Sequence, residues 1–146
     1  MNMVQVYIKG QEDKELSSFL RYYPVRIKNI GMDAFFDRQV IYDFKDGRNH
    51  ADVAKCVAKM LIKVVGERTA VHGTKVKKDE RAKRLKEKNN IEVDANFFKN
   101  KIVCIWDDVV TTGTSFCAYT AQLEQVGAHV TNGIFLGKTS YKYVQQ

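Results

Sequence analysis

The sequence predicts one α/β domain in which a parallel sheet is flanked by helices. A continuous apolar run at Ile102–Trp106, without alternation, is typical of a strand buried on both faces. A helical pattern and a second apolar run follow it, so residues 102–136 form a strand–helix–strand unit. Two further helical patterns, at 33–44 and 50–65, supply helices to cover the sheet. The length of 146 residues suits a single domain.

The N-terminal residues predict a strand and a helix. Alternating apolar side chains at Met3–Ile8 indicate the strand, and Lys14–Tyr22 is expected to be helical. Pro24, the only proline of the chain, marks the break that follows.

Two more helices are expected before the middle of the chain. The first, Asp33–Phe44, is punctuated at its end by Gly47. Asn49 is placed to cap the second, His50–Val65, and Gly66 to end it. The buried face of the second helix is expected to contain Val53, Val57, Met60, Leu61 and Val64.

Two adjacent acids, Asp107 and Asp108, follow the apolar strand. Open α/β sheets bind ligands at the carboxyl ends of their strands. Side chains alternate within a strand, but where the chain turns at the strand end both carboxylates can reach one ligand. Ionised carboxylates only accept hydrogen bonds, and a ribose offers two neighbouring hydroxyl donors. The pair therefore predicts a ribose site, although such pairs are also common in solvated turns.

The residues after the acids predict a phosphate site. Gly113 can adopt positive φ, so that backbone N–H groups point inward, and Thr114 or Ser115 is expected to cap the next helix. A helix N-terminus with several hydroxyls around it favours phosphate. That helix should end at Gly127, before a strand at His129–Leu136. Its expected apolar face is formed by Phe116, Tyr119, Thr120, Leu123 and Val126.

The segment DDVVTTGTS, residues 107–115, resembles the diphosphoribosyl-binding loop of type I phosphoribosyltransferases, whose fold is Rossmann-like. The resemblance implies that Asp107 and Asp108 bind the ribose 2′- and 3′-hydroxyls. It also places the 5′-phosphate against the loop formed by Val110, Thr111, Thr112, Gly113, Thr114 and Ser115. The 6-oxopurine branch of the family carries an aspartate at the position of Thr111, so that branch is disfavoured.

Two other segments resemble the competence-protein-like and uncharacterised bacterial branch of the family. Tyr42–Leu61 is similar to the lead-in to the first core helix, and Lys45 matches a lysine of that pattern. Gly133–Thr139 is similar to the closing strand. The resemblance implies a core at 41–140 and a hood that recognises the base, for which residues 1–40 are the candidate. Four aromatic residues there are able to stack on a base, although such residues are more often core: Tyr22, Tyr23, Phe35 and Phe36.

The family transfers phosphoribose from 5-phosphoribosyl-1-pyrophosphate to a nitrogen nucleophile such as a nucleobase. Mg²⁺ neutralises the pyrophosphate leaving group. By resemblance, Asp107 and Asp108 fix the ribose, stabilise the positive charge that develops on it, and contact the metal through water rather than directly. The sequence does not identify the base.

The middle of the chain departs from the family pattern. Family members place a buried strand and a pyrophosphate-binding loop after the first core helix, but here Gly66 leads directly to ERTAVHGTKVKK. Thr69–His72 is the only candidate strand. The chain is therefore expected to be shortened between Val65 and Thr69, with the pyrophosphate loop missing or rebuilt. Two explanations stay open: the enzyme is degenerate, or a partner chain in a homo-oligomer completes the site.

Residues 73–90 form a basic segment that contains much of the net charge of +7. Between Lys75 and Lys88, eight residues are basic and three are acidic. Three interpretations stay open: a solvated segment, a mobile loop that closes over pyrophosphate, or a contact with nucleic acid. The candidate pyrophosphate contacts are Lys45, Lys75, Lys77 and Lys78.

The leading hypothesis is thus a phosphoribosyltransferase that uses Mg²⁺. The alternative is a catalytically degenerate regulator with the same fold, which senses a ribose phosphate and contacts nucleic acid. A membrane protein is disfavoured, because no apolar stretch has the length of a span and no signal peptide pattern is present. Cys56, Cys104 and Cys117 are expected to be buried thiols in a reducing cytoplasm. Residues 137–139, Gly-Lys-Thr, are similar to the end of a nucleotide-binding P-loop, but the residues before them predict a strand.

Overall fold

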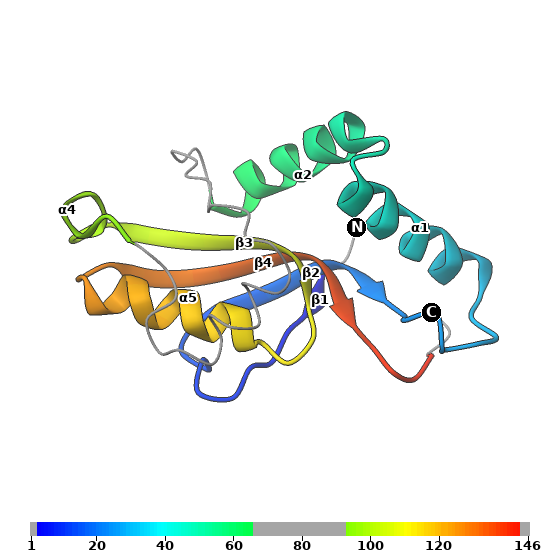
Figure 1. Cartoon of the computed structure of the whole chain (residues 1–146), viewed down its shortest axis with the longest axis horizontal. Helices are drawn as coiled ribbons and strands as arrows, with labels where there is room; N and C mark the ends of the chain where they lie inside the picture. Colours follow the sequence, from blue (N-terminus) through cyan, green and yellow to red (C-terminus); the bar gives the residue numbers. More distant parts are fainter. Residues whose placement is uncertain (1–2, 66–92, 144–146) are drawn as a thin grey trace.

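Four strands form one sheet in the computed structural model, which describes residues 3–65 and 93–143 (Figure 1). The elements in chain order are β1 (Val4–Gln5), β2 (Glu15–Tyr22), α1 (Met32–Asp46), α2 (His50–Val65), α4 (Ala95–Phe98), β3 (Ile102–Val110), α5 (Thr114–Gln125) and β4 (His129–Thr139). The predicted helices at 33–44 and 50–65 and the strand–helix–strand unit at 102–136 are confirmed. The predicted strand Thr69–His72 and the basic segment lie outside the described residues.

The sheet is mixed, so the prediction of a purely parallel sheet is wrong. The strand order is β1-β2-β4-β3, in which β2, β4 and β3 run parallel and β1 runs antiparallel to β2. The chain between β1 and β2 explains the difference. It turns back through Gly10, at φ 87°, and the Gln11 N–H donates to the Ile8 carbonyl at 3.0 Å. A connection this short joins antiparallel strands, because a parallel pair needs a crossover.

Residues 15–22 form strand β2 instead of the predicted helix at Lys14–Tyr22. The spacing of Leu16, Phe19 and Leu20 fits a helical period, but β2 lies between β1 and β4 and is covered on both faces. Leu16 therefore packs on one side of the sheet and Phe19 on the other. Pairing with two neighbouring strands outweighs the local pattern. The residues in which a hood was expected, 1–40, contribute β1, β2 and the start of α1.

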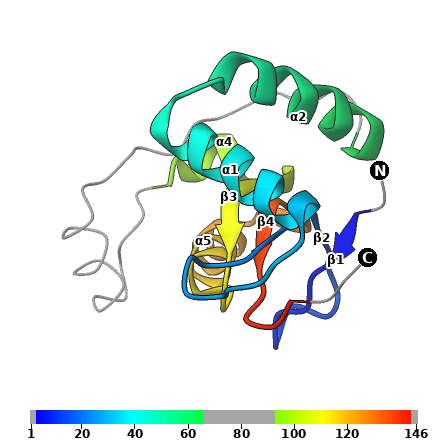
Figure 2. The same cartoon turned by 90° about the vertical axis from the view of Figure 1, so that its right-hand side faces the viewer.

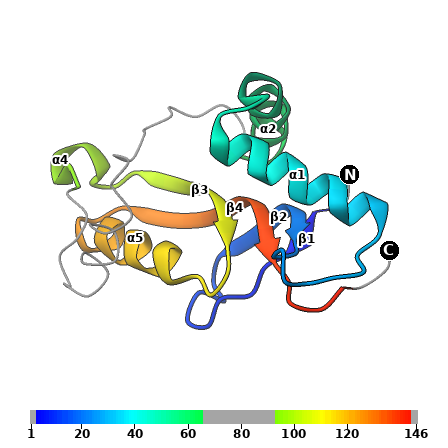
Figure 3. The same ribbon diagram turned by 45° about the vertical axis from the view of Figure 1, so that its right-hand side comes forward.

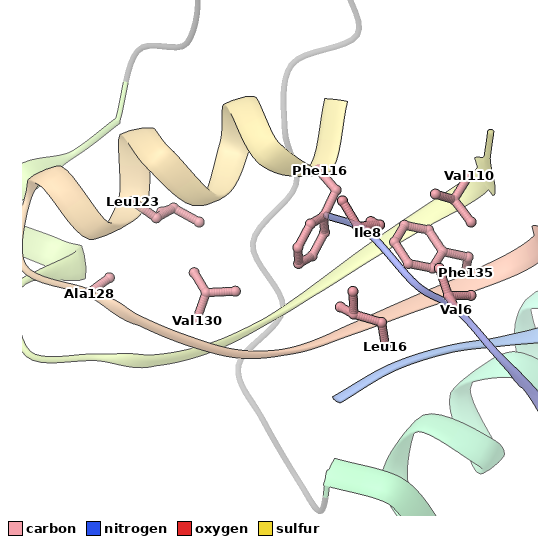
Figure 4. Packing of buried hydrophobic residues seen from close by; sticks show 9 residues of the cluster. All are labelled: Val6, Ile8, Leu16, Val110, Phe116, Leu123, Ala128, Val130 and Phe135. Atoms are coloured by element: carbon pink, nitrogen blue, oxygen red, sulfur yellow. The ribbon is translucent and has the colours of Figure 1, made fainter. Parts of the chain in front are cut away.

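Helices cover both faces of the sheet. Figures 1, 2 and 3 show α1 and α2 over one face and α5 over the other. The cluster beneath α5, shown in Figure 4, contains Val6, Ile8, Leu16, Val110, Phe116, Leu123, Ala128, Val130 and Phe135. The cluster beneath α1 and α2 contains Phe19, Ile41, Val57, Ile134 and Leu136. Burial of each large apolar side chain contributes roughly 1.5–3 kcal/mol, so these two clusters fix the positions of the helices on the sheet.

The observed helix ends agree in part with those predicted from the sequence. Gly47 and Gly127 adopt left-handed conformations, at φ 77° and 92°, where α1 and α5 end, as predicted. At the start of α2, the Asn49 carbonyl accepts the Val53 N–H, whereas its side-chain amide donates to Asp43. Asn49 therefore begins the helix with its backbone, and its side chain binds α1. Val57 is buried and Val53 partly buried, as predicted for the inner face of α2.

β3 lies at one edge of the sheet, and β4 is its pairing partner in the part of the chain that the structure describes. Its side chains from Val103 to Val109 are half-buried, whereas the sequence predicted burial on both faces. The prediction of three buried thiols is also wrong. Cys56 is exposed on α2, next to the inward-facing Val57, and Cys104 and Cys117 are half-buried. No helix of the described residues is both long and apolar enough to cross a membrane.

Candidate functional site

The carboxyl ends of β2, β4 and β3 lie side by side, because these three strands are parallel (Figure 1). We call the side of the sheet that they form the carboxyl edge. The Ser140 N–H donates to the Tyr22 carbonyl at 2.8 Å, which joins the ends of β4 and β2. The hydroxyls of Thr111 and Thr139 are 2.8 Å apart, which joins the ends of β3 and β4. Most of the predicted site residues lie at this edge.

The two acids lie inside β3, which continues to Val110. The predicted turn directly after Asp108 is therefore absent, and the two side chains follow the alternation of the strand. Asp107 pairs in register with Phe135, whose side chain lies beneath α5. Asp108 faces the opposite side, where its carboxylate meets Lys45 of α1. Each carboxylate also accepts the backbone N–H of the next residue, at 2.8 Å for Asp107 and 2.7 Å for Asp108.

Lys45 forms an ion pair with Asp108, so two predicted site residues from distant parts of the sequence come together. The Nζ–Oδ2 distance is 3.8 Å, and the side chains are 43% and 37% exposed. An ion pair this exposed is screened by water and contributes under about 1 kcal/mol to folding. Lys45 is therefore available to exchange its carboxylate partner for a ligand anion at little cost.

Gly113 shapes the loop before α5. Its φ is 86°, as predicted, and a Cβ atom at this position would lie 2.7–2.8 Å from three side-chain atoms of Ile8. Helix α5 begins at Thr114, so Gly113 occupies the N-cap position, and the prediction that Thr114 or Ser115 caps the helix is wrong. The residue directly before the helix must adopt positive φ to make the turn, and glycine does so most readily. Gly113 therefore occupies the cap position.

The first turn of α5 is open to an anion. Glycine has no side chain with which to cap the helix, and the first backbone N–H groups of a helix have no partner within it. The Cys117 N–H is the first to find a carbonyl, that of Gly113, at 2.9 Å. The Thr112 and Thr114 hydroxyls, 2.9 Å apart, lie beside this turn, and both residues are exposed. The geometry therefore combines N–H groups, hydroxyls and the positive end of a helix dipole.

Thr139 is a member of this site that the sequence did not indicate. Residues 137–139 end strand β4, so the sequence argument against a P-loop is confirmed. The contact between Thr139 and Thr111 depends on the pairing of β3 with β4. No spacing in the sequence reveals which strands are neighbours.

The four aromatic residues considered for base stacking differ in their surroundings. Tyr23 is buried, whereas Phe35 and Phe36 are 50% and 60% exposed on α1. The Tyr22 and Tyr42 hydroxyls lie 3.4 Å apart, and the hydrogen bond between them, together with burial, raises the pKa of Tyr42. Tyr23 therefore belongs to the core, while the two phenylalanines are accessible.

A cavity of about 500 Å³ lies at the opposite end of β4, lined by Asp13, Glu124, Gly127, Ala128, His129, Val130 and Thr131. Its two acids are already paired with Lys14, whose Nζ lies 2.9 Å from Glu124 and 3.2 Å from Asp13. The Lys14 side chain is 5% exposed, so this cluster ties the start of β2 to α5. The cavity is remote from the acids and the Gly113 loop.

The described residues contain no group of three or more His, Cys, Asp or Glu side chains placed to hold a metal. Asp107 and Asp108 are the carboxylates nearest to the loop in sequence, and their separate faces suit contact with a hydrated Mg²⁺ better than direct chelation. Lys75, Lys77 and Lys78 lie outside the described residues. No protein-family model, curated protein or solved structure matches the chain.

Proposed function

We propose that the chain binds 5-phosphoribosyl-1-pyrophosphate with Mg²⁺ and transfers its phosphoribose to a nitrogen nucleophile such as a nucleobase. The observation that carries the proposal is the position of the motif. Two acids near the end of a strand, a glycine at positive φ and an uncapped helix start follow one another at the carboxyl edge of the parallel strands. This edge is where open α/β sheets bind ligands.

The 5′-phosphate is proposed to bind at the start of α5. The backbone N–H groups of 114–116 and the hydroxyls of Thr111, Thr112 and Thr114 supply donors. A phosphate oxygen only accepts hydrogen bonds, so a site made of donors at a helix N-terminus suits it. Gly113 is needed at the centre, because a larger side chain would collide with Ile8.

The ribose and pyrophosphate are proposed to bind beside the acids. Asp108 would accept a ribose hydroxyl, and Lys45 would turn from Asp108 to the pyrophosphate. Bound Mg²⁺ would neutralise the leaving group. The protein itself would hold the ribose in position and place carboxylates near the developing positive charge. The nitrogen nucleophile would then attack the anomeric carbon. A carbon–nitrogen bond forms as the bond between this carbon and the pyrophosphate oxygen breaks.

The second candidate is a regulator that binds a ribose phosphate without catalysis. It is favoured by the sequence after α2, where Gly66 leads directly to ERTAVHG and no pyrophosphate loop is evident. In this case the basic segment 73–90 would contact nucleic acid phosphates. Both candidates bind the ribose 5-phosphate at the same site, formed by the two acids and the start of α5.

A thermal shift experiment tests the shared part of the two candidates. A ligand present at about 100 times its Kd stabilises the folded state by about 2.7 kcal/mol. For a chain of this size, that corresponds to an increase in Tm of roughly 5–10 °C. The increase should disappear in Asp107→Asn/Asp108→Asn and persist in the control Asp52→Asn, an exposed acid on α2. No increase in the wild type would refute both candidates.

Release of pyrophosphate separates the enzyme from the regulator. The wild-type chain is incubated with 5-phosphoribosyl-1-pyrophosphate, Mg²⁺ and each of a panel of bases, and pyrophosphate is measured. The enzyme releases it with at least one base. The regulator binds the ligand but releases none, and its affinity for RNA or DNA falls steeply with salt.

A further inference from the structure

We infer that Thr139 is a positioning residue of the phosphate site, which it serves by orienting the Thr111 hydroxyl toward a ribose 5-phosphate. The inference rests on the proposed function and adds a residue from a different strand to it. The contact that supports it is the 2.8 Å distance between the two Oγ1 atoms.

Thr139 is the fixed member of this pair. It lies in register with Tyr22 of β2, and the next residue, Ser140, donates its N–H to the Tyr22 carbonyl. Two positions earlier, Gly137 packs against the buried side chain of Ile41. Thr111, by contrast, is exposed and comes directly after β3 ends. The sheet therefore holds Thr139 in place, and Thr139 can hold Thr111.

The chemistry of a hydroxyl pair sets the direction of the hydrogen bonds. Each hydroxyl has one proton to donate, so the hydroxyl that accepts within the pair keeps its own proton. When a phosphate oxygen accepts from Thr111, the Thr111 oxygen must accept from Thr139. A chain from Thr139 to Thr111 to phosphate results, and each hydrogen bond polarises the next. A ligand that places a hydrogen-bond acceptor at this position gains from the arrangement, and the 5′-phosphate is the proposed acceptor.

Calorimetric titration of ribose 5-phosphate and of pyrophosphate tests the inference. Loss of one hydrogen bond of ordinary strength should weaken ribose 5-phosphate binding about fivefold to tenfold in Thr139→Val. Thr139→Ser keeps the hydroxyl and should stay within about twofold of the wild type, as should the control Thr131→Val, an exposed threonine at the other end of β4. Pyrophosphate affinity should be unchanged in all three, because pyrophosphate is proposed to bind at Lys45 and not at the Thr111 hydroxyl. A general loss of structure would lower both affinities.

A double-mutant cycle tests whether Thr139 acts through Thr111. Thr139→Val should cause no further loss in a Thr111→Val background, since the interaction is already absent. Thr139→Ala is measured in the same way, so that a folding defect of the valine variant does not decide the outcome. Wild-type affinity in Thr139→Val and Thr139→Ala, or additive losses in the cycle, would overturn the inference alone. A wild type that binds neither ribose 5-phosphate nor 5-phosphoribosyl-1-pyrophosphate would overturn the proposed function with it.

Discussion

Gly113→Ala should destabilise the fold and distort the loop before α5. Gly113 has φ 86°, and an alanine in this left-handed region costs roughly 1–2 kcal/mol. Its Cβ would also lie 2.7–2.8 Å from three atoms of Ile8, which is 5% exposed and cannot move into solvent. Overpacking of this kind costs about 1–3 kcal/mol. The free energy of unfolding should therefore fall by roughly 2–5 kcal/mol.

Gly10→Ala is a matched control for this substitution. Gly10 has nearly the same φ, 87°, but a Cβ there would meet nothing within 4 Å. Gly10→Ala should therefore lose only the backbone part, about 1–2 kcal/mol. Urea denaturation measures the free energy of unfolding of both variants. Ile8→Val in the Gly113→Ala background should recover part of the stability lost through the clash with Ile8. Equal losses in the two glycine variants would refute the argument that Ile8 supports the loop.

Three further predictions concern the elements around the site. Gly137→Ala should lower the free energy of unfolding in urea by about 1–3 kcal/mol, because its Cβ would lie 2.5 Å from Ile41 Cδ1. A variant as stable as the wild type would contradict this packing. Lys45→Ala should change the free energy of unfolding by less than about 1 kcal/mol, because the ion pair with Asp108 is exposed; a loss of several times this amount would show that the pair is structural. Burial raises the pKa of the Asp37 carboxyl above its usual 3.8, because the folded state favours the neutral form. The stabilisation from the neutral carboxyl is therefore complete below pH 3.8 and is lost as the pH rises through the raised pKa. Asp37→Asn should remove this loss and be more stable than the wild type at pH 7 in thermal unfolding, whereas an unchanged or lower Tm would contradict the sign.

The parts of the fold that the sequence predicts well are those with strong local signals. Gly47 and Gly127 end helices because few other residues tolerate positive φ, and both were predictable from the pattern before them. The apolar run at 102–106 is a strand because its β-branched residues pack well in a sheet. Residues 50–65 show a helical period over several turns.

The parts that the sequence does not predict depend on tertiary neighbours. β2 is buried on both faces, so its apolar residues lose the alternation that would reveal a strand. Within the described residues β3 pairs on one side only, with β4, which accounts for its half-buried side chains. Strand order, rather than composition, decides this. Thr139 reaches the site because β3 lies beside β4, which no local pattern reveals. The sequence predicted Lys45 as a site residue, but not that Lys45 pairs with Asp108.

Within the site, the sequence predicts the loop better than the acids. Gly113 adopts the predicted positive φ, because the turn from β3 into α5 requires it. The acids do not turn together at the strand end, because each accepts the next backbone N–H while β3 continues to Val110. The helix cap likewise lies at Gly113 instead of the predicted Thr114 or Ser115, because the residue that makes the turn is also the one that precedes the helix.

Chemical shift mapping shows directly where on the fold 5-phosphoribosyl-1-pyrophosphate binds. The ¹⁵N-labelled chain is titrated with 5-phosphoribosyl-1-pyrophosphate and Mg²⁺, and the backbone amide signals are followed. The largest shifts should fall on the amides of residues 107–108 and 111–117, while the signals of α2 should stay in place. No shifts at saturating ligand would contradict the proposed site, as would shifts centred on His129 and Thr131 at the opposite end of β4.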